Sequence, residues 1–324
     1  MSAVESMVKR IEELKARRRA VILAHNYQLP EVQDIADFLG DSLGLSRKAA
    51  QADAQVIVFC GVHFMAETAS ILCPDKTVLM PDPRSDCPMA RMITAGELRA
   101  LKLRHPGGVV VCYVNSTAEV KAESDLCCTS ANAVEVVGAI EPGKPVIFVP
   151  DKYLGAYAAA RAGRELILWE GYCPIHACIL PEDVERARAE HPGAVVMVHP
   201  ECLPEVSARA DVVESTSGMC RFARQTDARQ IVVGTEVGLL YRLRKENPEK
   251  VFYPLSEAAI CPNMKRNTLE KVLWSLEEMR HEVRVPEEVR GRARRAIEAM
   301  VAAGQSVACS QGHRQPRAEG KKRL

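Results

Sequence analysis

The chain contains 324 residues, of which 47% are hydrophobic and 26% are charged, a composition typical of globular proteins and not of disordered or fibrous ones. Its length suits two or three domains. The 43 Lys and Arg residues almost balance the 42 Asp and Glu residues, and the formal net charge of +1 excludes a pervasive basic field. We therefore expect neither nucleic acid nor a membrane as a partner.

The N-terminal segment is charged where a signal peptide needs an apolar core, and no later stretch approaches 18 consecutive apolar residues. These features predict a cytoplasmic protein. Twelve cysteines are many for a reducing compartment, where thiols serve metal or redox chemistry more often than disulfides. Most of them, such as Cys60, Cys112 and Cys128 beside apolar runs, are still expected to be small core residues.

Amphipathic helices are expected near both ends of the chain. Apolar residues recur with helical spacing from Val4 to Leu14, and again over residues 287–303. Two internal segments, 64–73 and 238–247, have the same patterning. The sequence then becomes polar, basic and aperiodic, so we expect residues 305–324 to form a disordered tail.

Three similar blocks of sequence follow one another at intervals of roughly 87 residues. Each block begins with an apolar, β-branched run that leads into a polar or aromatic residue. The three residues in this position are His25, Tyr113 and His199. A hydroxyl residue follows each of them 17 positions later, and these are Ser42, Ser130 and Thr216. Such agreement indicates an internal repeat.

Two further apolar runs complete each block, and helical patterning fills the segments between them. Short continuous runs of Val, Ile and Leu are typical of parallel strands that are buried on both faces. The pattern predicts an α/β fold of three homologous repeats, each a three-stranded βαβαβ unit flanked by helices. Packing of three such three-layer α/β/α repeats around a pseudo-threefold axis would leave a central cavity. The expected units are residues 1–105 with the N-terminal helix, 106–191, and 192–304 with the C-terminal helix. The expected strands begin near Val21, Val56, Thr77, Val109, Val146, Leu166, Val195, Ile231 and Val251.

A Cys-Pro pair follows the third run of each block, at Cys87, Cys173 and Cys261, with spacings of 86 and 88 residues. Functional residues of open parallel sheets gather beyond the carboxyl ends of the strands, so threefold packing would bring one thiol per repeat to a common centre. Structural zinc prefers closely spaced cysteine pairs and four ligands, whereas three thiolates suit an open 4Fe-4S cluster. Zinc and plain core thiols remain alternatives. Cys73, which also precedes a proline, lacks repeat partners and is interpreted as structural.

The three hydroxyl residues stand near expected helix starts. Each of Ser42, Ser130 and Thr216 can serve there as an N-cap, which stabilises a helix by about 1 kcal/mol. Three such positions around one axis would also direct helix N-termini toward the cavity, a favourable site for carboxylate or phosphate. The expected ligand is therefore small and multiply anionic.

Motifs over nearly the whole chain resemble those of the quinolinate synthase family. They are AHNYQ (24–28), GDSLGLS (40–46), GVHFMAET (61–68), CYVNS (112–116), CTSANA (128–133), PDKYLG (150–155), WEGYCPIH (169–176), HPEC (199–202), ESTSGM (214–219), GTEVG (234–238) and CPNMK (261–265). The resemblance implies one 4Fe-4S cluster per chain, held by Cys87, Cys173 and Cys261. It also implies the condensation of iminoaspartate (iminosuccinate) with dihydroxyacetone phosphate to quinolinate, phosphate and water in de novo NAD biosynthesis. L-aspartate oxidase or aspartate dehydrogenase would then be the functional partner that supplies the imine.

The resemblance also implies a set of active-site residues. Substrate contacts are expected at His25, Ser42, Tyr113, Val114, Asn115, Ser130, His199, Pro200, Glu201 and Thr216. Glu201 is the expected general base, because desolvation near a cluster would raise the pKa of its carboxyl group toward the working range. His25, Tyr27, Tyr113 and His199 would relay protons or hydrogen-bond an enediol, and the iron without a protein ligand would act as a Lewis acid. His176, three residues after Cys173, is interpreted as a partner of a ligand and not as a ligand.

Two other functions stay open on the sequence. A hydro-lyase could use the same open cluster on another hydroxy acid. A non-enzymatic iron–sulfur sensor or carrier is less favoured, because such a protein needs no repeated hydroxyl residues for anion binding.

Overall fold

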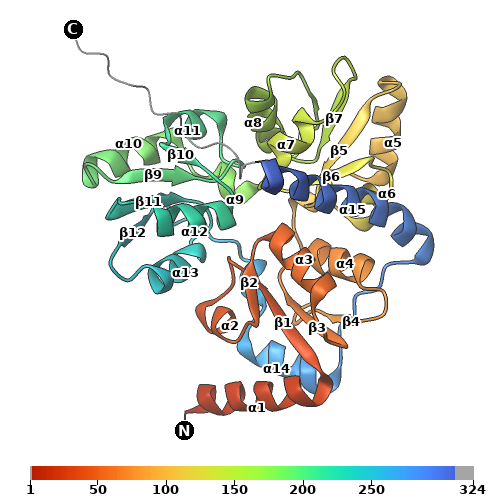
Figure 1. Cartoon of the computed structure of the whole chain (residues 1–324). Coiled ribbons are helices and arrows are strands. Elements are labelled where there is room, and N and C mark those ends of the chain that lie inside the picture. Colours follow the sequence, from red (N-terminus) through yellow and green to blue (C-terminus); the bar gives the residue numbers. More distant parts are fainter. Residues whose placement is uncertain (1, 311–324) are drawn as a thin grey trace.

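The computed structural model describes residues 2–310, with side chains described for residues 2–300. Within this part of the chain, twelve strands form three parallel four-stranded sheets, with the orders β2-β1-β3-β4, β6-β5-β7-β8 and β10-β9-β11-β12. Figure 1 shows one lobe for each sheet, and the three lobes surround a common centre. The α/β class and the three homologous units are as predicted.

The first lobe contains the first sheet and the helices that cover it. Its elements are α1 (Ala3–Arg18), β1 (Ala20–His25), α2 (Pro30–Asp34), β2 (Phe38–Gly40), α3 (Ser42–Gln51), β3 (Val56–Cys60), α4 (His63–Leu72), β4 (Thr77–Leu79) and the 3-10 helix η1 (Met89–Arg91). Side chains of β1 alternate between two cores. Val21 and Leu23 pack in the core that contains α3 and α4, whereas Ile22 and Ala24 pack in the core that contains α1. This alternation produces the three-layer α/β/α arrangement.

The second and third lobes repeat this order of elements. The second contains α5 (Ala95–Arg104), β5 (Val109–Tyr113), α6 (Ala118–Ala122), β6 (Leu126–Cys128), α7 (Ala133–Gly138), β7 (Val146–Val149), α8 (Lys152–Ala162), β8 (Ile167–Leu168) and α9 (Pro174–Ala177). The third contains α10 (Pro181–Glu190), β9 (Val195–Val198), α11 (Pro204–Arg209), β10 (Val212–Val213), α12 (Thr216–Gln225), β11 (Gln230–Gly234), α13 (Leu239–Glu246), β12 (Val251–Pro254) and η2 (Met264–Arg266). All nine expected strands are present.

Each sheet has one strand more than the three that the sequence predicts. The additional strands, β2, β6 and β10, contain only two or three residues and lie at the edge of their sheets beside the first strand of each unit. Polar residues border each of these short segments on both sides, so none of them forms the continuous apolar run by which the other strands were predicted. The observed order is that of a doubly wound sheet, in which the second strand is added on one side of the first strand and the later strands on the other side. The crevice at the carboxyl ends of the strands lies where the order switches, beside the first strand.

Two helices at the end of the chain cover the earlier lobes. Helix α14 (Leu269–Glu278) packs against α1 and β3, and α15 (Glu287–Ser310) packs against α6, β6 and α4. Helix α5 contacts α6, and α10 contacts α11. From these contacts we propose that the second and third units begin ahead of α5 and α10, and not at residues 106 and 192. Helix α15 continues past residue 305, and the remainder of the expected basic tail lies outside the described residues.

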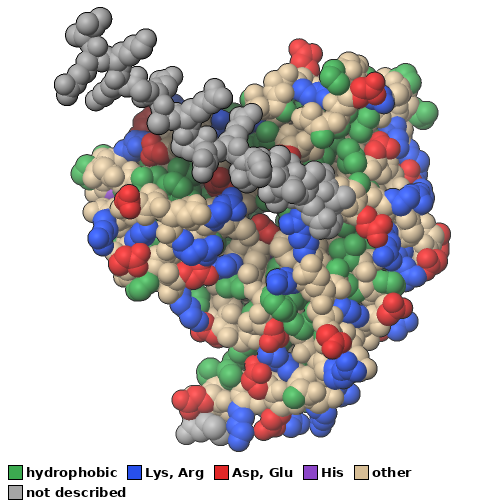
Figure 2. Space-filling model, viewed as in Figure 1, with side chains coloured by type: hydrophobic (Ala, Val, Ile, Leu, Met, Phe, Trp, Pro, Cys, Tyr) green, Lys and Arg blue, Asp and Glu red, His purple; other side chains and the backbone are tan. Residues whose placement is uncertain are grey.

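The outer surface agrees with the balanced composition. Figure 2 shows Lys and Arg side chains interspersed with Asp and Glu side chains over the visible face. None of the helices in the described part of the chain is both long enough and apolar enough to span a membrane.

Candidate active site

A cavity of about 290 Å³ lies where the carboxyl ends of the three sheets meet, and side chains from all three lobes line it. The predicted site residues among its lining are His25, Tyr27, Ser42, Cys87, Tyr113, Asn115, Ser130, Cys173, His199, Glu201, Thr216 and Cys261. Val114 and Pro200 are buried but do not line the cavity. The Val114 N–H donates to the Cys128 carbonyl at 2.9 Å, so this residue extends the pairing of β5 with β6.

The first strand of each sheet delivers its side chains in the same way. His25 ends β1, Tyr113 ends β5, and His199 directly follows β9. The residue two positions further on in each lobe, Tyr27, Asn115 or Glu201, also lines the cavity. The repeat therefore supplies two functional positions per lobe, of which the sequence pattern revealed only the first as a repeated position.

The two histidines of this set are neutral and share one orientation. The Tyr27 N–H donates to His25 Nδ1 at 3.2 Å, and the Glu201 N–H donates to His199 Nδ1 at 3.4 Å. Because Nδ1 is an acceptor in both rings, the proton lies on Nε2, and His199 donates from there to Ser130 Oγ at 3.2 Å. Burial lowers the pKa of His25 and of His199 to about 3, so both present a neutral N–H donor.

Glu201 lies at the centre of a buried hydrogen-bond network. The Tyr113 hydroxyl donates to Oε1, and His176 Nδ1 lies 2.8 Å from Oε2. Burial raises the pKa of the Glu201 carboxyl, but the charge interaction and hydrogen bond with His176 outweigh burial and lower this pKa to about 2. The expectation of a raised pKa for Glu201 is therefore wrong, because the sequence did not show that His176 would contact this carboxylate.

His176 extends the network to the first lobe. Its Nε2 lies 2.9 Å from Thr235 Oγ1, and Thr235 Oγ1 lies 2.6 Å from the Tyr27 hydroxyl. Hydrogen bonds thus connect Tyr27 through Thr235 and His176 to Glu201. Burial raises the pKa of Tyr27 and of Tyr113 well above the usual value, so both phenols stay protonated.

The three hydroxyl residues do not cap their helices. Asp41 Oδ1 accepts from the Gly44 N–H at 2.8 Å and is the N-cap of α3, so Ser42 is the first helical residue. Ser215 is the N-cap of α12 in the same way, and Thr216 follows it. Capping by a neighbouring residue leaves the Ser42 and Thr216 side chains on the cavity wall at the N-termini of two ten-residue helices.

Ser130 differs from the other two hydroxyl residues because it lies in a turn ahead of α7, whose N-cap is Asn132. No Lys or Arg occurs among the described residues that line the cavity. Anions in this cavity would therefore depend on helix N-termini, hydroxyl groups and imidazole N–H groups. Asn115 Oδ1 adds an acceptor, since it is buried and has no hydrogen-bond partner among the described residues.

Eleven cysteines lie in the part of the chain whose side chains the structure describes, and apart from Cys178, which is exposed, they fall into two groups. Seven are buried within the lobes, as expected for core residues, and these are Cys60, Cys73, Cys112, Cys127, Cys128, Cys202 and Cys220. Cys87, Cys173 and Cys261 are partly exposed, unpaired, and line the cavity. Burial raises the pKa of the Cys87 thiol to about 12, with a smaller contribution from Cys261, and burial also raises the pKa of Cys173, with a contribution from Cys87. The three thiols thus share one cavity, and Cys87 lies near both of the others.

This donor set fits a metal group. One thiol from each lobe faces a common space, and thiolates are the usual ligands of iron–sulfur clusters. The ligand atoms of Cys173, His176 and Glu201 lie within 4.8 Å of one another, so a carboxylate and an imidazole stand beside one thiol. His176 was expected to be a partner of a ligand, and its Nδ1 lies 3.1 Å from Cys173 Sγ; the sequence did not indicate that the same atom would also contact Glu201.

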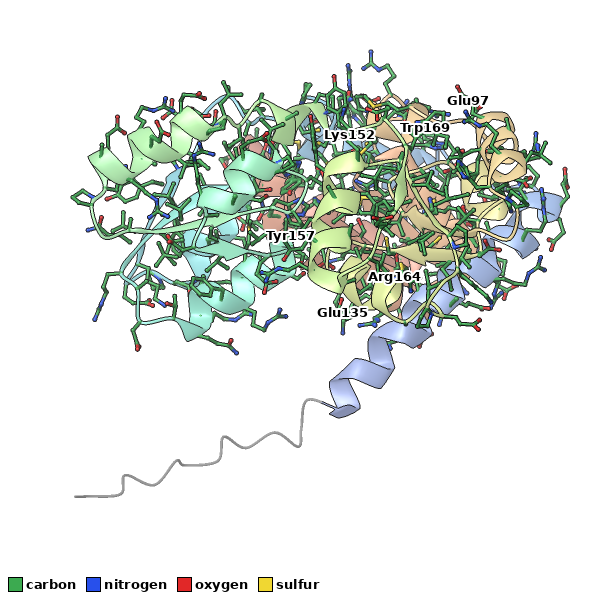
Figure 3. All side chains as sticks on the ribbon, turned by 90° about the horizontal axis from the view of Figure 1, so that it is seen from above. Glu97, Glu135, Lys152, Tyr157, Arg164 and Trp169 are labelled. Carbon is green, nitrogen blue, oxygen red and sulfur yellow. The ribbon has the colours of Figure 1, made fainter. Side chains whose placement is uncertain are left out.

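Several contacts between lobes hold the cysteine segments in place. The Ser85 hydroxyl donates to the Asn263 carbonyl at 2.7 Å, which joins the segments of Cys87 and Cys261. Trp169, labelled in Figure 3, donates from Nε1 to the Met92 carbonyl at 2.7 Å and joins the second lobe to the first. The cavity is therefore a feature of the assembled lobes and not of any single one.

An internally repeated α/β architecture with three thiols and a buried acid–imidazole network in one central cavity defines the class of this protein. Residues 9–302 match the family described as Quinolinate synthetase A protein, and the chain belongs to the quinolinate synthase family. The chain is 60% identical over 297 residues to a quinolinate synthase of Dehalococcoides mccartyi (strain CBDB1), a match that covers 92% of this chain and 98% of the relative.

Two further relatives carry the same name. A quinolinate synthase of Methanosarcina barkeri is 57% identical over 296 residues, with 91% of this chain and 97% of the relative covered. A quinolinate synthase of Thermus thermophilus is 55% identical over 305 residues, with 93% of this chain and 98% of the relative covered. A solved reductase structure from Plasmodium falciparum matches 78% of this chain and 87% of its own, but at a TM-score of 0.34 and 10% identity this likeness bears on neither fold nor function.

Proposed function

We propose that the chain condenses iminoaspartate with dihydroxyacetone phosphate to form quinolinate, with loss of phosphate and two waters, by means of a 4Fe-4S cluster held by Cys87, Cys173 and Cys261. The observation that carries the proposal is the single cavity in which the three thiols meet the Tyr113–Glu201–His176 network. Family membership supports the same reaction. When it is bound, such a cluster supplies one iron without a protein ligand, which serves as a Lewis acid toward a substrate hydroxyl or carboxylate.

The lining residues provide the means to bind two small anions. The N–H groups at the starts of α3 and α12, with the Ser42 and Thr216 hydroxyls, suit carboxylate or phosphate oxygens. His25 and His199 add neutral N–H donors at Nε2. The Asn115 carbonyl oxygen accepts from a hydroxyl or imine N–H of the substrate, which would satisfy an acceptor that the described residues leave unpaired.

Proton transfer falls to the network around Glu201. Its carboxylate accepts from the Tyr113 hydroxyl and from His176 Nδ1, so a proton that a phenol gives to the substrate can be replaced along the hydrogen-bonded chain that reaches Tyr27. A carboxylate with a pKa of about 2 is a weak base on its own. We therefore assign the proton-exchanging role to the linked groups and keep Glu201 as the anion that orients them.

The sharpest test is anaerobic purification of the full chain, followed by iron and sulfide analysis and a quinolinate assay with the two substrates. The proposal expects four iron and four sulfide per chain and quinolinate formation that depends on both substrates. Iron-free protein with full activity would refute the cluster, and cluster-loaded protein without quinolinate formation would refute the reaction. The supply of the imine by L-aspartate oxidase or aspartate dehydrogenase is part of the same proposal.

A further inference from the structure

Glu236, which lines the cavity, forms an ion pair with Lys265, and the proposed chemistry uses neither residue. Glu236 lies two residues beyond β11 and is 1% exposed, and Lys265 lies in η2, four residues after Cys261. Lys265 Nζ lies 2.9 Å from Glu236 Oε1 and 3.1 Å from Oε2. Removing a charge pair from water is unfavourable unless further hydrogen bonds satisfy both groups, so the other partners of the pair indicate its role.

Those partners belong to two segments of the active site. The Cys261 N–H donates to Glu236 Oε1 at 2.9 Å, and the Gly238 N–H donates to Oε2 at 2.8 Å. Lys265 Nζ also donates to the Tyr27 carbonyl oxygen. The pair therefore connects the backbone of a proposed cluster ligand in the third lobe to the backbone of an active-site phenol in the first lobe.

The same segment of the third lobe also holds the other end of Tyr27. The Tyr27 hydroxyl lies 2.6 Å from Oγ1 of Thr235, the residue that precedes Glu236. Tyr27 is thus fixed at its carbonyl by Lys265 and at its hydroxyl by Thr235. A displacement of this segment would move the Cys261 backbone and the Tyr27 ring together.

Gly238 provides an independent observation at the same place. A Cβ atom on this residue would lie 2.6 Å from Lys265 Nζ, 2.8 Å from Glu236 Oε2 and 2.8 Å from the Tyr27 carbonyl oxygen. Its φ of −60° suits any residue, so the glycine is required for this close approach and not for its backbone conformation. The absence of a side chain at Gly238 therefore leaves the space in which the Lys265 ammonium, the Glu236 carboxylate and the Tyr27 carbonyl oxygen meet.

We propose that Glu236 and Lys265 are positioning residues that set the placement of the Cys261 thiolate relative to the Tyr27 hydroxyl. The proposal rests on the proposed function, because a cluster at Cys261 and proton transfer at Tyr27 are what require a fixed placement. A pair that only stabilised the fold would have no need to bridge these two segments.

The chain offers a matched control for this pair. Lys271 Nζ lies 2.8 Å from Oδ2 of Asp82, a carboxylate that is 2% exposed, and it also donates to the Arg266 carbonyl at 2.8 Å. The Lys271 side chain is 26% exposed, against 20% for Lys265. Neither Lys271 nor Asp82 lines the cavity. This second pair reaches the Arg266 carbonyl of η2 but contacts neither Cys261 nor Tyr27, so removing Lys271 tests the loss of a comparable pair that does not bridge those two segments.

The experiment compares Lys265→Met, Lys265→Arg and Lys271→Met in the anaerobically purified full chain. We expect both methionine variants to unfold at lower temperature. Only Lys265→Met should exchange amide hydrogens about tenfold faster than the wild type in the peptide that contains Cys261. Only this variant should also release iron faster to a chelator. Its kcat should fall, while its KM stays within about twofold of the wild-type value. Lys265→Arg should recover most of the loss. Equal hydrogen exchange and equal iron release in the two methionine variants would overturn the proposal.

A second variant keeps the test decisive if Lys265→Met does not fold. Gly238→Ala leaves both charges in place but forces their contact apart, so it should increase exchange at the Cys261 peptide and iron release. Wild-type values for both would overturn the positioning role. Hydrogen exchange requires no cluster, so it reports on positioning even if the wild-type chain contains no iron, an outcome that would refute the proposed function instead.

Discussion

Replacement of Glu201 by Gln tests the centre of the active-site network. The side chain keeps its size but loses the charge that accepts from the Tyr113 hydroxyl and from His176 Nδ1, 2.8 Å away. Hydrogen bonds to a charged acceptor contribute about 1.5–3 kcal/mol each, so we expect the free energy of unfolding to fall by a few kcal/mol. Acid–base groups contribute about 10²- to 10⁴-fold to turnover, so kcat should fall by that factor, or about 3–5 kcal/mol in barrier.

Glu67→Gln is the matched control for this variant. Glu67 is also a buried glutamate with a histidine partner, because His63 Nδ1 lies 3.5 Å from its Oε1, but it does not line the cavity. Quinolinate formation, iron content and thermal unfolding should be measured for both variants. Glu201→Gln should retain iron and lose turnover, whereas Glu67→Gln should lose stability alone. Wild-type turnover in Glu201→Gln, or an equal loss in both variants, would refute the assignment.

Three other predictions address the thiols, the anion sites and acid stability. Cys173→Ser should lose the brown cluster absorption together with activity, whereas Cys60→Ser, altered within the first-lobe core, should keep both; iron retention in the first variant would contradict the ligand assignment. Thr216→Val should raise KM for one substrate about tenfold with little change in iron content, and unchanged KM values would remove this hydroxyl from substrate binding. The pKa values of His25 and His199 are lowered from 6.5 to about 3, so below pH 6.5 the unfolded chain binds protons that the folded chain does not. The free energy of unfolding, measured in urea, should therefore fall between pH 6.5 and 3 by up to about 1.4 kcal/mol per pH unit for each histidine, and a flat profile would contradict their burial as neutral rings.

The sequence predicted those strands and helices that appear as a continuous apolar run or as a helical repeat of apolar residues. Continuous apolar runs predicted nine of the twelve strands, and helical periodicity predicted α1, α4, α13 and α15. The repeat also predicted that Cys87, Cys173 and Cys261 would face one space. Periodicity could not show where α14 and α15 dock, because an apolar stripe identifies a buried face without identifying its partner.

The site was less predictable because its properties depend on distances across lobes. Glu201 has a low pKa since His176 lies 2.8 Å away, although 25 positions separate them in the chain. The caps at Asp41 and Ser215 could not be distinguished from the hydroxyl residues that follow them, because either type of residue can cap a helix. Both the pKa of Glu201 and the identity of the N-caps depend on distances and angles in the folded chain, which a pattern of residue types does not specify.

Threefold repetition suits the proposed function, in which one scaffold holds a symmetric metal group and performs asymmetric chemistry. The cysteine position is the same in each lobe, but the position at the end of the first strand carries histidine in two lobes and Tyr113 in the second. Two positions later, the residues are Tyr27, Asn115 and Glu201. His25 and His199 each accept the N–H from that later residue, whereas Tyr113 directs its hydroxyl to Glu201 of the neighbouring lobe. Under the proposed function, proton transfer is thereby concentrated between the second and third lobes, and the N-termini of α3 and α12 leave the first and third lobes to bind anions.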